Sequence, residues 1–169
     1  MTFAPALAVA PDGEAYLTAG FTGTLDTDPT PNATTPLAQS GANTNLFLLR
    51  LNPDGNLRYA TAANTPGNDL LPTAIALDGL GRANVTASSQ QTPDPGADPN
   101  DPVPDTDAYL YQFNARGRSV YVRHWDDNAN DVIPKALAAD AAGNLVLAGL
   151  ATSRLDLDHG PATHFVSAL

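Results

Sequence analysis

The stretch Ala136-Leu137-Ala138-Ala139-Asp140-Ala141-Ala142-Gly143 is the third copy of a motif that occurs earlier as Ala6-Leu7-Ala8-Val9-Ala10-Pro11-Asp12-Gly13 and as Ala74-Ile75-Ala76-Leu77-Asp78-Gly79-Leu80-Gly81. A proline lies shortly before each copy. From Gly13 to Gly81 is 68 residues, and from Gly81 to Gly143 is 62. Self-similarity at a nearly constant spacing indicates a repeat architecture, in which one supersecondary unit recurs along the chain.

A second motif recurs between these copies. The sequence FLLRLNPDG at 47–55 matches YLYQFNARG at 109–117, and FVSAL at 165–169 resembles the start of a third copy. In the first unit, apolar runs are separated by turns rich in Asp, Asn and Gly; they occupy residues 6–10, 14–21, 46–52 and 57–63. Such turn residues tolerate the backbone of tight hairpins, so each unit predicts four antiparallel strands.

The first run of each unit is apolar at consecutive positions, which predicts a strand buried on both faces. Its alanines suit a crowded centre. A short helix over 135–142 is the rival interpretation, because alanine favours helix. A four-stranded unit of about 60 residues with a crowded inner strand is typical of a propeller blade. The fold expected is all-β, a single repeat domain over 1–169 with blades at about 5–66 and 72–128 and a partial blade at 134–169.

The order of these motifs resembles a known family. Ala-x-Ala-x-Asp-x-x-Gly-Asn, then Ala-Gly, then Leu-Asp-x-Asp, then Phe-Val-x-x-Leu-Asn-Pro-Asp-Gly is similar to the bacterial β-propeller repeat often called SBBP. The best matches are at 136–149, 47–57 and 165–169, and the second unit departs most, with Gly-Leu-Gly-Arg at 79–82. The resemblance implies blades in secreted or cell-surface bacterial proteins, and it implies no catalytic residue set.

Composition excludes several functional classes. The 169 residues include no cysteine, so disulfides and thiolate chemistry are absent. The net charge of −10 argues against nucleic acid as a partner. No apolar run is long enough to span a membrane, and no signal peptide is visible at the N-terminus. Two full blades and a partial one leave unsatisfied edges, which predicts packing against other protein subunits or the rest of a longer chain.

Two groups of residues are candidate metal ligands. The loop at 93–107 holds five aspartates and five prolines. Clustered carboxylates suit calcium, and the candidate ligands are Asp98, Asp101, Asp105 and Asp107. The alternative interpretation is a solvated loop whose negative charges repel one another.

The second group of candidate ligands is the three histidines, His124, His159 and His164. Imidazoles with a carboxylate nearby suit copper or zinc, and such a site could process superoxide. The alternative interpretation is that the three histidines are unrelated loop residues.

An aromatic group in the second unit is the last candidate site. Aromatic rings at Tyr109, Tyr111 and Trp125 could stack on a carbohydrate, whereas packing between blades is the alternative interpretation. The sequence has no nucleophile elbow, P-loop or paired catalytic carboxylates. The function expected is therefore a non-catalytic structural or interaction module of a bacterial surface or secreted assembly, with a metal-dependent redox enzyme and a carbohydrate-binding surface as alternatives.

Overall fold

The structure is a computed structural model, and it describes residues 5–31, 33–65, 68–91, 106–125, 131–152, 155–156 and 165–166. Every regular element in these ranges is a β-strand. The strands form two four-stranded sheets and three two-stranded sheets, all antiparallel. The all-β class expected from the sequence is confirmed, and the stretch at 135–142 that could have been a helix is the end of a strand followed by a turn.

Two sheets follow the repeat. The first sheet has the order β1-β2-β5-β6, with the strands Ala6–Val9, Ala15–Phe21, Asn45–Leu51 and Leu57–Ala63. The second sheet has the order β7-β8-β9-β10, with the strands Asn68–Leu77, Ala83–Gln91, Thr106–Phe113 and Ser119–Trp125. Each is a meander that pairs consecutive full-length strands, as the four apolar runs of a unit predict.

The third sheet and two small hairpins complete the fold. The third sheet pairs β11, Val132–Ala139, with β12, Leu145–Ala151. The hairpin of β3, Thr24–Asp26, and β4, Pro36–Ala38, extends from the first sheet. Residues 165–166, at the start of the segment that resembles a third copy of the second motif, form β14, Phe165–Val166, which pairs with β13, Leu155–Asp156.

The repeated turns have a shared local cause. In each, a glycine with φ between 70° and 90° closes the hairpin, for example Gly143 at 90°. In the turns that end at Gly55, Gly81, Gly117 and Gly143, a side-chain oxygen three residues before the glycine accepts from the backbone N–H that follows it. In the turn between β1 and β2, Asp12 Oδ1 accepts from Glu14 N at 3.2 Å instead. Asp140 Oδ1 accepts from Asn144 N at 2.8 Å, and Asp78 Oδ1 accepts from Arg82 N at 3.0 Å. Asp and Asn therefore recur at these positions because they satisfy the turn backbone.

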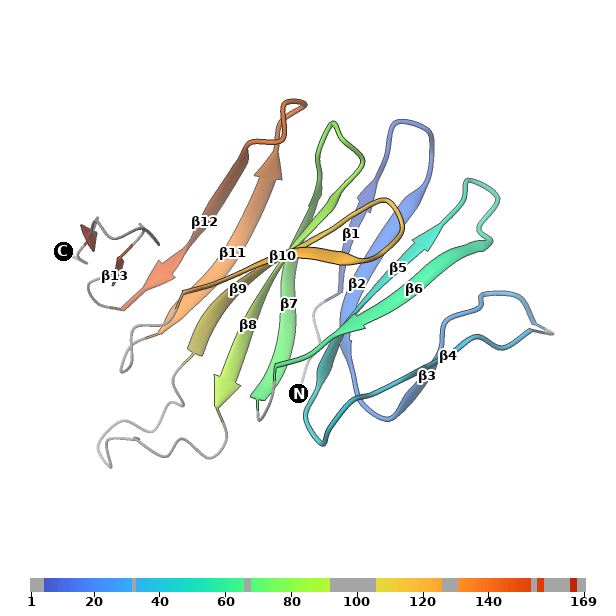
Figure 1. Cartoon of the computed structure of the whole chain (residues 1–169), viewed down its shortest axis with the longest axis horizontal. Helices are drawn as coiled ribbons and strands as arrows, with labels where there is room; N and C mark the ends of the chain where they lie inside the picture. The colour runs from blue at the N-terminus through green and yellow to red at the C-terminus, as the bar shows by residue number, and fades with distance from the viewer. Residues whose placement is uncertain are drawn as a thin grey trace.

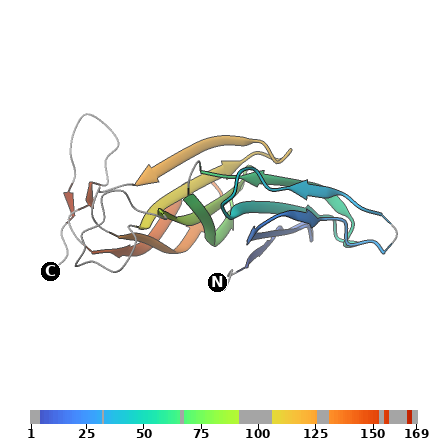
Figure 2. The same ribbon diagram turned by 90° about the horizontal axis from the view of Figure 1, so that it is seen from below.

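The three sheets stack side by side (Figures 1 and 2). The first strands of neighbouring sheets are in contact, since β7 contacts both β1 and β11. The turns that join β1 to β2, β7 to β8 and β11 to β12 lie along the same edge of the three sheets, at the top of Figure 1. The core lies between the first two sheets, and its fully or nearly fully buried members are Tyr16, Leu46, Leu48, Leu70, Ala83, Val85, Ala87, Tyr111 and Phe113.

The expectation that each first strand is buried on both faces is wrong for β1. Exposure alternates along this strand, and Leu7 and Val9 are each 62% exposed. The reason is that β1 contacts the second sheet with one face only. In β11, Pro134 is buried whereas Ala136 and Ala138 are exposed. Consecutive apolar residues therefore indicate strands that can be buried on both faces. Among the described residues, however, the first and third sheets each pack against one neighbouring sheet.

A close approach between turns joins the second and third sheets. A Cβ added to Gly79 would overlap the carbonyl oxygen of Ala141 in the turn between β11 and β12. We expect Gly79→Ala to lower the free energy of unfolding by about 1–3 kcal/mol, because the added methyl group pushes two backbones apart. Urea denaturation measures the loss.

The matched control is Leu80→Ala. Leu80 is 65% exposed beside Gly79, so its truncation should change the free energy of unfolding by less than about 0.5 kcal/mol. Hydrogen exchange should increase in β11 and β12 of Gly79→Ala more than in β5 and β6. Equal losses for the two variants would show that this turn contact does not hold the third sheet in place.

Candidate functional site: two exposed sheet faces

The strand register gives each sheet two distinct faces. The front face is defined here as the side that carries Leu7 in the first sheet, Ile75 in the second and Leu137 in the third, which are equivalent positions of the repeat. The back face is the other side. Side chains alternate along a strand, so the register assigns every paired residue to one face.

Inside the chain, each back face packs on the front face of the next sheet. Tyr16, Leu46 and Leu48 lie on the back face of the first sheet, according to its register. They form one buried cluster with Val85 and Phe113 from the front face of the second sheet. The second sheet in turn contacts β11 of the third through β7, β8 and β9.

The front face of the first sheet is only partly covered among the described residues: Phe21 and Phe47 on this face are buried, whereas the side chains beside β1 are exposed. Leu7 pairs with Leu17, and Leu17 pairs with Leu49, so these side chains share this face. The exposed or half-buried members are all apolar: Leu7, Val9, Ala15, Leu17, Ala19, Leu49, Leu51, Ala60 and Ala62. The face is therefore an apolar surface built from four strands.

The back face of the third sheet is uncovered in the described part of the chain. Val146 pairs with Ala138, and Ala148 pairs with Ala136, which places these side chains on one side of the hairpin. Val146 is 69% exposed and Leu150 is 60% exposed. Contiguous apolar surface of this kind marks interaction sites in folded proteins. Sequence reasoning expected open blade ends, but it did not identify these residues.

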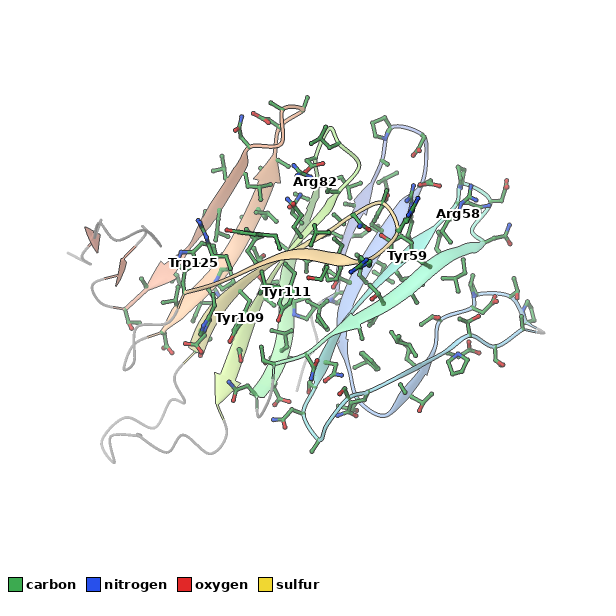
Figure 3. The ribbon with its side chains drawn as sticks, viewed as in Figure 1. Arg58, Tyr59, Arg82, Tyr109, Tyr111 and Trp125 are labelled. Carbon is green, nitrogen blue, oxygen red and sulfur yellow. The ribbon has the colours of Figure 1, made fainter. Side chains whose placement is uncertain are left out.

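The carbohydrate candidates do not share one face. Tyr109 and Tyr111 stack at 6.0 Å between ring centroids on the front face of the second sheet (Figure 3). Tyr111 is 5% exposed in the core, and this burial raises its pKa to about 12. Trp125 pairs with Ala108, so it lies on the back face, where it lines a hollow against the third sheet. The three rings therefore form no common stacking platform.

One histidine and one aspartate from the metal candidates are brought together. His124 Nε2 lies 3.1 Å from Asp107 Oδ2, and the imidazole stacks on Tyr109 at 4.2 Å between ring centroids. The other candidate ligands, His159, His164, Asp98, Asp101 and Asp105, lie outside the described residues. Within the described residues there is no group of three or more His, Cys, Asp or Glu side chains that could hold a metal ion.

A polar junction joins the first two sheets, and sequence reasoning missed it. Glu14 is 6% exposed, and its carboxylate pairs with Arg50 and, at 3.3 Å, with Arg58. Arg50 Nη1 also donates to the carbonyl oxygen of Ala115 in the second sheet at 2.7 Å. Beside these groups Tyr59 is half-buried, and burial raises its pKa to about 12. The only signal in the sequence was that Glu14 is its single glutamate.

A second ion pair stabilises the turn after β7. Arg82 Nε lies 2.7 Å from Asp78 Oδ2, and the N–H groups of Leu80 and Arg82 donate to Oδ1. Burial alone would raise the pKa of Asp78. The hydrogen bonds from Arg82 and Leu80 outweigh burial, and the pKa lies below its ordinary value. Asp78 is thus a structural carboxylate that stays ionised in the folded chain.

No protein-family model matches the chain, and no curated protein matches it in sequence. Within the described ranges, no helix has the length and apolar character needed to cross a membrane.

Proposed function

We propose that this chain is a non-catalytic interaction module built from β-propeller-type repeats. The observation that carries the proposal is the pair of apolar faces at the two ends of the sheet stack. Val146 and Leu150 on one end face and Leu7 on the other are all at least 60% exposed. Leaving such surface in water is unfavourable, so a partner that covers it gains free energy from its burial.

The propeller-type arrangement is part of the same proposal. Its support is the repetition of one meander with its first strands adjacent, β1 beside β7 and β7 beside β11. Radial repetition of four-stranded sheets around their first strands is the geometry of propeller blades. The resemblance to the SBBP repeat supports a place for the module in a bacterial surface or secreted assembly.

A pair of isosteric substitutions tests whether the end faces are free. We expect Val146→Thr to change the free energy of unfolding by less than about 0.5 kcal/mol, because the new hydroxyl remains in water. The matched control is Val85→Thr. Val85 is fully buried, so the same substitution there should cost about 1–3 kcal/mol.

Urea denaturation compares the two variants, and the fluorescence of bis-ANS, a dye that binds apolar surface, reports the exposed face. We expect weaker dye fluorescence with Val146→Thr than with the parent chain. If Val146→Thr destabilised the chain as much as Val85→Thr, the back face of the third sheet would be covered by the chain itself. The proposed function would then be wrong.

A further inference from the structure

The two exposed end faces are of the same two types as the faces that pack together inside the chain, where the first sheet meets the second. Where the first and second sheets meet, a back face packs on a front face, and Tyr16 on the back face joins the cluster against which Ile75 and Leu77 pack. In the repeat, Val146 is the equivalent of Tyr16. Likewise, Leu7 and Val9 are the equivalents of Ile75 and Leu77.

The faces that remain exposed therefore have opposite types. The first sheet presents a front face, and the third sheet presents a back face. The same rule of packing would pair them, but they lie at opposite ends of one stack (Figure 1). The front face of one copy of the chain can, however, meet the back face of a second copy in this way.

We infer that copies of this chain associate head to tail, with the back face of the third sheet of one copy on the front face of the first sheet of the next. This inference rests on the proposed function and names the partner as a second copy. The contact is heterologous, so it closes into a ring if the rotation between copies allows closure and otherwise extends into a filament.

Charge favours this contact over others. The net charge of −10 makes copies repel at most orientations, whereas the two end faces carry no charged side chain at their paired positions. Val146 would then lie against Leu7 and Val9, as Tyr16 lies against its neighbours in the second sheet. Salt screens the repulsion without weakening apolar contact, so association should strengthen as salt is raised.

The absence of cysteine allows a direct cross-linking test on the whole chain. We would prepare Leu7→Cys and Val146→Cys as separate proteins and treat each alone, and the mixture of both, with a short bis-maleimide. The expected result is a covalent dimer in the mixture and monomer in each single preparation. Val122→Cys is the matched control, since Val122 is 49% exposed on β10 but belongs to neither end face.

The outcomes separate the inference from the proposed function. Cross-linking of Leu7→Cys with itself would indicate a two-fold, front-to-front dimer and would overturn the head-to-tail arrangement. A mixture that links no better than Val122→Cys would overturn it too. In both cases the Val146→Thr comparison still reports whether the faces are free, so the proposed function is judged separately.

Sedimentation of the parent chain gives the second readout. The average mass of the sedimenting species should rise with protein concentration and with salt concentration. Val146→Asp should raise the dissociation constant by roughly tenfold or more, because docking would bury an unpaired carboxylate. Unchanged association of Val146→Asp would place the contact elsewhere and overturn the inference.

Discussion

Phe113→Ala is expected to lower the free energy of unfolding by about 3–5 kcal/mol, because it removes a large ring from a packed core. Phe113 is 1% exposed on β9, and it stacks on Tyr111 with 6.1 Å between ring centroids. Its position between the first and second sheets means that the cavity would lie at their junction. Chemical denaturation with tryptophan fluorescence and circular dichroism, followed in parallel, measures the loss.

The control for Phe113→Ala is Val122→Ala. Val122 lies on the neighbouring strand β10 and is 49% exposed, so its truncation should change the free energy of unfolding by less than about 0.5 kcal/mol. If both variants unfolded with the same midpoint as the parent chain, the two sheets would not depend on this junction. That result would also undermine the packing rule from which the head-to-tail contact is inferred.

The strands were predictable because two signals agree. The expected run at 57–63 is β6, Leu57–Ala63, and the other three runs of the first unit match β1, β2 and β5 to within one residue at each end. The apolar runs predict the strands, and the Asp, Asn and Gly residues between them predict the turns. These signals are local, so the repeat could be located without knowledge of how the sheets pack.

The faces were less predictable because they depend on register between strands. Trp125 and Tyr109 were expected to share a ligand surface, but β10 pairs Trp125 with Ala108 and His124 with Tyr109. A shift of one residue moves a side chain to the opposite face. Sequence alternation orders the residues within β9, but it does not say which residues of β10 lie beside them.

The burial of side chains at the two ends of the stack could not be predicted from the sequence either. Leu7 and Ile75 occupy equivalent positions of the repeat, yet Leu7 is 62% exposed whereas Ile75 packs against the core. The difference comes from the neighbouring sheet and not from the residues themselves. Glu14 shows the same limit, because the sequence places it at the start of the run at 14–21 but does not predict its burial against Arg50.

Glu14→Gln is expected to lower the free energy of unfolding by about 2–3 kcal/mol. The amide keeps the shape of the side chain but leaves the Arg50 guanidinium without its counter-ion. Breaking a buried ion pair costs about 3–5 kcal/mol, and the 20% exposure of the Arg50 side chain reduces that cost. Urea denaturation at neutral pH and low salt measures it.

The same carboxylate offers an internal control. Arg58 lies 3.3 Å from Glu14 with a side chain that is 57% exposed, so Arg58→Gln should cost less than about 1 kcal/mol. The double variant Glu14→Gln/Arg50→Gln should cost less than the sum of its single variants, by about 1 kcal/mol or more, because the two residues act as one unit. Additive losses would contradict the coupling.

The effect should also reach the second sheet. Arg50 donates to the carbonyl oxygen of Ala115, and the guanidinium lies 5.2 Å from the ring centroid of Tyr16. A guanidinium held by Glu14 therefore fixes the turn between β9 and β10 against the first sheet. Hydrogen exchange in β9 and β10 should increase in Glu14→Gln and not in Arg58→Gln. An increase confined to β2 and β5 would mean that Glu14 stabilises only its own sheet.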